Sequence, residues 1–187
     1  MDFISTLLIA IALAMDAFSV SLTKGFSLKT ITKSQILWFG IFFGGFQALM
    51  PVLGWLGGIQ LEWLITTFAP WVAFILLVLI GSNMIRESFS DEEEMSDKFS
   101  FKELTLLAIA TSIDAFAVGI TYAALKTDIL IPVIMIGVVA FIFTIIGIYL
   151  GKKIGNYFGD KFEIIGGVIL ILLGVKILLE GLGILVL

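Results

Sequence analysis

The sequence predicts an all-α membrane protein in which six transmembrane helices form two inverted-topology three-helix repeats. Three observations lead to this prediction: 60% of the 187 residues are hydrophobic and only 14% are charged, the apolar residues form long runs, and the first run has a close copy in the second half. A soluble domain of this size could not bury so much apolar surface in one core. Lipid is therefore the expected solvent for most of the chain.

Six apolar runs are long enough to cross a bilayer, which takes about 20 residues for about 30 Å of hydrocarbon. Residues 90–100 separate the third run from the fourth, and because they are acidic and lack apolar periodicity we expect a cytoplasmic linker there. The first repeat is then residues 1–89 and the second is residues 101–187. The six runs are Phe3 to Lys24, Gln35 to Ile59, Phe68 to Phe89, Phe101 to Leu125, Ile129 to Gly151 and Phe162 to Leu187.

Lysine and arginine fall mainly on one side of these predicted helices. They follow the first, third and fifth runs, whereas the other connections contain only Lys126. Because basic connections tend to stay in the cytoplasm, we expect both termini on the extracytoplasmic side of a multi-pass protein in the inner (plasma) membrane.

An internal repeat appears when Leu7 to Thr23 is overlaid on Thr105 to Thr121. About half of the positions are identical, and the shared pattern Asp-Ala-Phe-x-Val places Asp16 opposite Asp114. Each half crosses the membrane three times, so the second half must enter from the opposite side. In proteins built this way, the substrate site tends to lie near the bilayer midplane between the halves.

The composition also excludes several kinds of function. The chain has no cysteine and no histidine, which excludes disulfides and zinc sites built on thiolate or imidazole. Its net charge of -4 comes largely from the acidic linker, and no basic patch suggests a nucleic-acid partner. We expect neither an enzymatic activity nor a bound cofactor.

Asp16 and Asp114 are the main candidates for chemistry, because an aspartate at the centre of a membrane helix costs about 2.5 to 3.5 kcal/mol. One interpretation is structural: each carboxyl is protonated and bonds a neighbouring helix. The other is that two carboxylates meeting at the repeat axis repel each other unless they share protons or hold a cation.

Other oxygen-bearing side chains could complete a site. Ser19 and Thr111 lie about one turn from an aspartate, and Pro51 removes the helical partner of the Gln47 carbonyl near the middle of its run. An ordinary proline kink and hydroxyls bonded to their own helix are the alternatives. Oxygen ligands suit Mn²⁺, Mg²⁺ or Ca²⁺. The candidate metal-site residues are Asp16, Asp114, Gln47, Ser19, Thr111 and Thr144, the repeat partner of Gln47.

Lys176 lies deep in the last run. Its ammonium group either reaches out to the interface or neutralises a carboxylate, and the sequence leaves both options open.

Residues 14–21 (AMDAFSVS), 110–119 (ATSIDAFAVG) and 50–55 (MPVLGW) closely resemble the manganese efflux pump (MntP-type) family of bacterial membrane proteins, and the resemblance covers essentially the whole chain. It implies that Asp16 and Asp114 are metal-site residues and that Mn²⁺ is the transported substrate. Many members have a glutamate where this chain has Gln47, which affects metal selectivity or proton stoichiometry more than the fold. One branch of the family is named only for sporulation.

These observations predict a secondary transporter that exports Mn²⁺ across the cytoplasmic membrane by alternating access, coupled to protons or another cation. Its partners would be the divalent ion, protons and the lipid bilayer, and the sequence leaves open whether it forms a homodimer. The alternative is a non-transporting membrane scaffold or sporulation-associated protein whose buried aspartates are structural.

Overall fold

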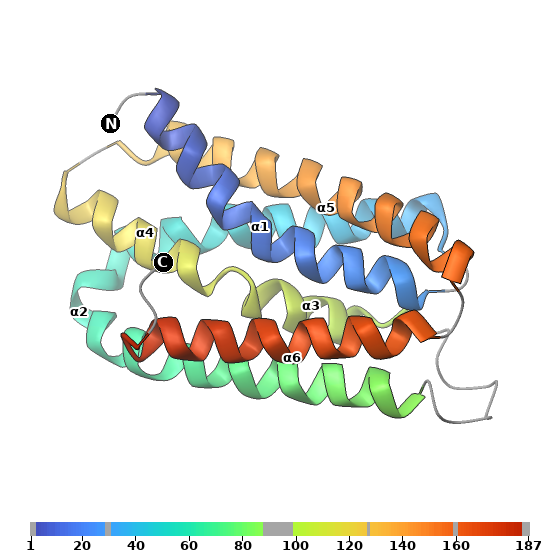
Figure 1. Cartoon of the computed structure of the whole chain (residues 1–187). Helices are drawn as coiled ribbons and strands as arrows, with labels where there is room; N and C mark the ends of the chain where they lie inside the picture. Colours follow the sequence, from blue (N-terminus) through green and yellow to red (C-terminus); the bar gives the residue numbers. More distant parts are fainter. Residues whose placement is uncertain (1–2, 29–30, 88–98, 127, 159–160, 185–187) are drawn as a thin grey trace.

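The computed structural model describes residues 3–28, 31–87, 99–126, 128–158 and 161–184, and all regular structure in these ranges is α-helical (Figure 1). The predicted all-α class is thereby confirmed for these ranges. Most of the predicted acidic linker, residues 90–100, lies outside them. The helices are α1 (Phe3–Ser27), α2 (Lys33–Glu87), α3 (Phe101–Ala110), α4 (Ile113–Ala124), α5 (Leu130–Phe158) and α6 (Lys161–Gly181).

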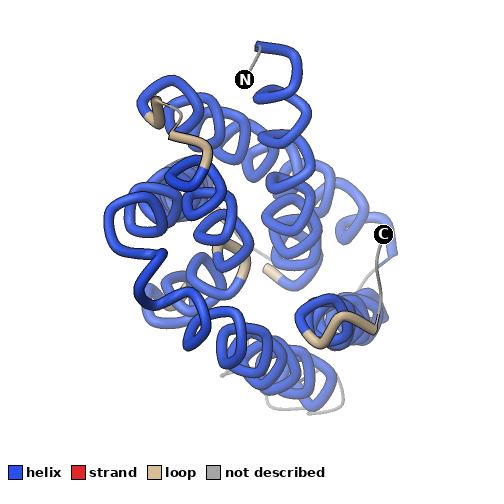
Figure 2. Tube along the Cα trace, turned by 90° about the vertical axis from the view of Figure 1, so that its left-hand side faces the viewer, coloured by secondary structure: helices blue, strands red, loops and turns tan. Residues whose placement is uncertain are grey.

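The helices form an elongated bundle whose connections lie mainly at its ends (Figure 1), and Figure 2 shows the same bundle viewed from one end. By length and composition, four segments of the described chain can cross a membrane, or five if α3 and α4 form one broken span. The described part of the protein is therefore that of a multi-pass membrane protein. The four unbroken segments are Phe3–Phe26, Lys33–Gly57, Leu130–Ile154 and Ile164–Gly181.

Helix α2 contains both the second and the third predicted runs. It is 55 residues long, contains Pro51 and Pro70, and reverses direction in its middle, so that its first and last parts run in opposite directions (Figure 1). Its third-run portion contributes the shorter apolar stretch Pro70–Ser82. Helix α2 packs on α4, α5 and α6, whereas α1 packs mainly on α5.

Close contacts between α2 and α5 occur in matched pairs. A Cβ atom added to Gly44 would lie 2.8 Å from the carbonyl oxygen of Gly137, and one added to Gly40 would lie 2.7 Å from the ring of Phe141. The sequence offset that relates Gly40 to Gly137 also relates Gly44 to Phe141. Each contact is therefore the counterpart of the other under the repeat.

The contact between α2 and α6 has the same property. A Cβ atom on Gly81 would lie 2.5 Å from the Gly167 carbonyl oxygen, and one on Gly174 would lie 3.3 Å from the Phe74 carbonyl oxygen. One constant offset relates Gly81 to Gly174 and Phe74 to Gly167. Small residues let the two helices approach closely at both points.

The α1–α5 and α4–α2 contacts do not match in this way. The Phe18 carbonyl faces Gly147, whereas the Phe116 carbonyl faces Gly54. Phe18 and Phe116 are repeat partners, and so are Gly54 and Gly151. If the two contacts matched, the Phe18 carbonyl would face Gly151, but it faces Gly147, which lies one helical turn earlier. These two helix pairs therefore differ in register by one turn.

The fourth predicted run, Phe101 to Leu125, is not one continuous helix. It breaks at Thr111 and Ser112, and α3 and α4 meet at 43°. The run contains no proline, and its hydroxyls instead bond back to the preceding turn: Ser112 Oγ donates to the Ala108 carbonyl at 2.6 Å. The same back-bonding occurs at Ser19 and Ser21 in the continuous helix α1, so it accompanies the break without being sufficient to cause it.

Candidate functional site

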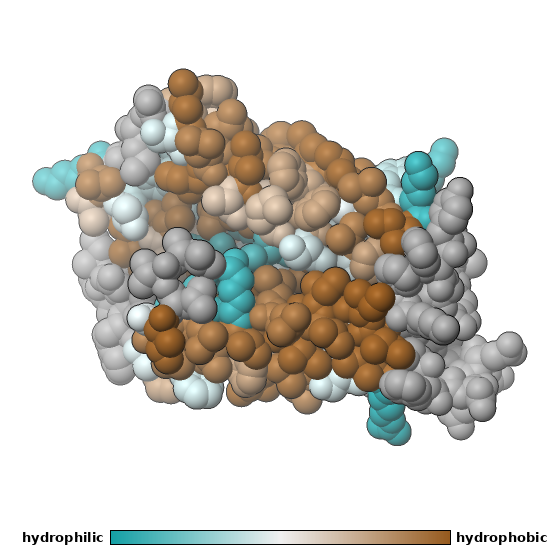
Figure 3. Space-filling view, in the orientation of Figure 1, coloured by the Kyte–Doolittle hydropathy of each residue, from teal (hydrophilic) through white to brown (hydrophobic). Residues whose placement is uncertain are grey.

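A cavity of about 420 Å³ lies between α1, α4, α6 and the last part of α2. Four of its lining side chains are ionisable: Asp16, Asp114, Lys176 and Glu180. The others are apolar apart from the backbone of Gly181. Figure 3 shows a hollow in the apolar face of the molecule with hydrophilic atoms inside it.

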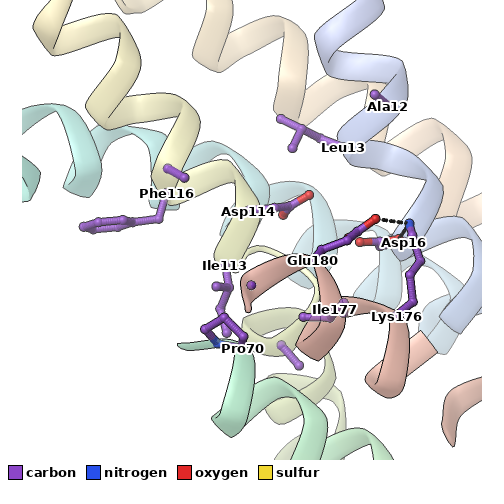
Figure 4. A pocket seen from close by; sticks show the side chains of 13 residues that line it. Ala12, Leu13, Asp16, Pro70, Ile113, Asp114, Phe116, Lys176, Ile177 and Glu180 are labelled. Atoms are coloured by element: carbon purple, nitrogen blue, oxygen red, sulfur yellow. Dashed lines mark ion pairs between the residues drawn. The ribbon is translucent and has the colours of Figure 1, made fainter. Parts of the chain in front are cut away.

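The two repeat-related aspartates reach this cavity from different helices. Asp16 lies in the middle of α1, and Asp114 is the second residue of α4, just after the break. Figure 4 shows both carboxylates directed into the space between α1, α4 and α6. The Asp114 carboxylate accepts the N–H of Ala115 at 2.8 Å. The break therefore both positions Asp114 and leaves its second oxygen available to the cavity.

Lys176 and Glu180, on the last turns of α6, complete the charged part of the wall. The Lys176 ammonium nitrogen lies 3.8 Å from Asp16 Oδ1 and 3.6 Å from Glu180 Oε1 (Figure 4). Of the two options that the sequence left open for Lys176, the structure shows the neutralisation of a carboxylate. Sequence reasoning did not include Glu180 in the site, although its spacing of one turn from Lys176 was a usable signal.

The acidic groups are not gathered into a compact cluster. Within the described ranges, no three acidic side chains are close enough together to hold a metal ion jointly.

Gln47 is fully buried beside the cavity rather than in its wall. Its side-chain nitrogen donates to the Leu13 carbonyl at 3.1 Å and to the Thr111 carbonyl at 2.9 Å. The Thr111 carbonyl lies at the helix break, where Ala115 N–H bonds the Asp114 side chain. Gln47 thus stabilises the break and ties it to α1, as broken membrane helices require.

The other predicted ligands also lie outside the cavity lining. The hydroxyls of Ser19 and Thr111 donate to the carbonyls of Met15 at 2.9 Å and Leu107 at 3.0 Å in their own helices. Thr144 is fully buried, and its hydroxyl has no hydrogen-bond partner among the described residues, which is also true of Gln47 Oε1. The structure therefore places Asp16 and Asp114 in the lining of one cavity and the other four predicted residues outside that lining.

Replacing Gln47 by leucine is expected to lower the free energy of unfolding by about 1 to 3 kcal/mol, because the Thr111 carbonyl loses its donor in a buried place. Thermal unfolding of the purified protein in detergent would measure the effect. Ser19→Ala is the control, and it should change stability by no more than about 0.5 kcal/mol. If the Gln47→Leu protein unfolds at the same temperature as the wild type, the role assigned to this amide is wrong.

An ion pair joins α1 to α3 at the end of the bundle where α1 ends and α3 begins. Lys24 at the end of α1 forms an ion pair with Glu103 in the first turn of α3, and Lys24 is only 7% exposed. Beside this pair, the rings of Phe99 and Phe101 lie 4.8 Å apart, and Trp38 lies 5.6 Å from Phe101. An ion pair and packed aromatic rings therefore hold α1, α2 and α3 together at this end.

Comparisons with a family model and with individual proteins both point to one family. Residues 30–178 match the family model described as "Putative manganese efflux pump". A protein named "Putative manganese efflux pump MntP" from Methanobrevibacter smithii is 66% identical over 94% of this chain and 96% of its own length. Proteins of the same name from Methanosphaera stadtmanae and Desulfitobacterium hafniense are 63% and 53% identical, over 94% of this chain and over 98% and 94% of their own lengths. No solved structure matches. The chain therefore belongs to the family described as "Putative manganese efflux pump".

Proposed function

We propose that this protein is a secondary transporter that exports Mn²⁺ across the cytoplasmic membrane, with Asp16 and Asp114 as the residues that hold the ion. The observation that carries the proposal is that two repeat-related aspartates from different helices line one cavity inside a bundle of apolar helices. The names of the relatives supply the identity of the ion. Carboxylate oxygens are suitable ligands for Mn²⁺.

We further propose that the six predicted helices form two inverted repeats, with α2 supplying the second and third. The matched contacts of Gly40 with Phe141 and of Gly44 with Gly137 support this arrangement. Inverted repeats place the transport site between the halves, which agrees with a cavity lined by both α1 and α4.

The shape of the cavity supports alternating access. Its lining extends from Ala110 toward Pro70 and Gly181, at the end of the bundle where α1 begins and α6 ends (Figure 1). Under the predicted orientation this end is extracytoplasmic, and the Lys24–Glu103 pair closes the cytoplasmic end. The conformation described here is then one that faces outward.

Export of a divalent ion needs an energy source, because an inside-negative potential opposes it by about 2.3 kcal/mol per charge per 100 mV. Inward movement of protons is the simplest source. Carboxylates that bind either protons or Mn²⁺ would couple the two fluxes by competition at one site.

The test is a flux measurement with purified protein in liposomes that contain a manganese-sensitive dye. We expect Mn²⁺ entry into the lumen that accelerates when the lumen is made more acidic than the outside, together with alkalinisation of the lumen as protons leave. Liposomes without protein are the control. If no Mn²⁺ crosses under any proton gradient, the transport proposal is wrong.

A further inference from the structure

We propose that Lys176 is a built-in counter-ion of the metal site: it pairs with Asp16 while the site is empty and moves to Glu180 when the metal ion binds. This inference rests on the proposed function, because it concerns the same cavity. It assigns a role to two residues of α6 that lie outside the aspartate pair.

The position of the ammonium group supports this role. Its nitrogen lies 3.8 Å from Asp16 and 3.6 Å from Glu180, so it is shared between the two carboxylates. Lys176 and Glu180 are one turn apart on α6, and the lysine side chain is 44% exposed and so has room to move. A rotation of its flexible stem is sufficient to leave Asp16 and remain paired with Glu180.

Charge balance explains why the ammonium should move. A divalent cation and an ammonium cannot both contact Asp16 without repulsion, and this repulsion is strong where little water is present. The ionisable groups that line the cavity are Asp16, Asp114, Glu180 and Lys176. If all are ionised, their net charge of minus two equals the charge of one divalent cation with opposite sign.

When Lys176 pairs with Glu180 and the ion binds the aspartates, the charges in the cavity form two sets, each with no net charge. Asp16 and Asp114 are neutralised by the divalent ion, and Lys176 is neutralised by Glu180. A monovalent cation would leave one carboxylate uncompensated in an apolar surrounding, which is costly. The two aspartates therefore favour divalent over monovalent ions, and the competing ammonium of Lys176 limits affinity so that the ion can be released.

The proposal predicts opposite effects for the two α6 residues on equilibrium binding of Mn²⁺, measured by dialysis of the purified protein in detergent. Lys176→Met removes the competitor and should lower the Kd by about tenfold or more, while slowing turnover in liposomes. Lys176→Arg keeps the charge and should recover most of the wild-type Kd. Glu180→Gln leaves the ammonium without its second partner and should raise the Kd.

A double variant separates this role from direct coordination by Glu180. If Glu180 acts through Lys176, then Glu180→Gln should have little effect on the Kd in the Lys176→Met background. If Glu180 is itself a ligand, the same loss of affinity appears in both backgrounds, and the counter-ion role is wrong. Lys153→Met, at the exposed far end of α5, is the matched control and should leave the Kd unchanged.

The outcomes also distinguish this inference from the proposed function. If Asp114→Asn abolishes Mn²⁺ binding while Lys176→Met leaves the Kd unchanged or raises it, the counter-ion role is wrong and the aspartate site stands. If the wild-type protein does not bind Mn²⁺, both are wrong. Lys176→Gln provides the same test if the methionine variant does not yield folded protein.

Discussion

Replacement of Asp114 by asparagine is expected to reduce Mn²⁺ transport by at least about a hundredfold, and Asp16→Asn should do the same. Each change removes one of the two negative charges that we assign to the ion, and the attraction between a carboxylate and a divalent cation in contact with it is several kcal/mol at the effective dielectric constant near a protein surface. Even partners that only orient a metal ligand are worth about 10- to 100-fold in affinity. Initial rates of Mn²⁺ flux in liposomes, normalised to the amount of folded protein, measure the effect.

Asp128→Asn is the matched control for these variants. Asp128 is exposed between α4 and α5, and its side chain accepts the N–H of Leu130 at 3.0 Å, which asparagine can also do. Its flux should equal that of the wild type. Unchanged flux in both cavity variants would exclude the aspartate site. If neither aspartate variant yields folded protein and the wild type shows no Mn²⁺ flux, the alternative of a non-transporting membrane scaffold is favoured.

The second large effect is expected at Gly119, where Gly119→Ala should prevent the accumulation of folded protein. A Cβ atom at this position would lie well inside the van der Waals contact distance of the Pro51 carbonyl oxygen, and its three nearest atoms all belong to the Pro51 backbone, so no flexible side chain can yield. Overpacking of a well-packed interior costs about 1 to 3 kcal/mol, and a clash with backbone should reach the upper end or exceed it. Size-exclusion chromatography in detergent and thermal unfolding report the loss.

Gly45 offers a control on α2, in the same protein and the same lipid environment. A Cβ atom at Gly45 would meet nothing within 4 Å. Gly45→Ala should therefore be tolerated, and alanine's higher helix propensity could add up to about 1 kcal/mol of stability. Equal yields of folded Gly119→Ala and Gly45→Ala protein would show that the close approach of α4 to α2 is not required.

The sequence was sufficient to predict the helical membrane class and to relate Asp16 to Asp114. Both predictions depend on signals that a single chain carries: the length of apolar runs, and a repeated Asp-Ala-Phe pattern. The proposal that the two aspartates form a metal site remains a prediction, and the cavity that contains both supports it.

The partner of Lys176 could not be predicted, because the apolar residues of α6 are distributed all around the helix and do not indicate which face turns inward. An amphipathic helix reveals in its sequence which face turns inward, but a helix surrounded by lipid and apolar neighbours does not. The rotation of α6 that brings Lys176 to Asp16 is set by packing contacts such as those of Gly167 and Gly174 with α2.

The break in the fourth run was missed for a different reason. Its residues Thr111 and Ser112 are ordinary in a membrane helix, and no proline or glycine lies between Ala110 and Asp114. What allows the helix to break is the Gln47 amide, which comes from a residue far away in the chain and bonds the freed Thr111 carbonyl. The sequence drew attention to Gln47 through Pro51, but not to this contact.

The duplicated aspartates occupy different surroundings, just as the α1–α5 and α4–α2 contacts differ in register by one turn. Copies that occupied equivalent surroundings would titrate and bind alike, and either could be exchanged for the other. Here Asp16 lies next to an ammonium group from α6, whereas Asp114 follows a helix break and accepts a backbone N–H. A duplicated sequence has thus given rise to two non-equivalent carboxylates, one with a resident cation beside it and one without.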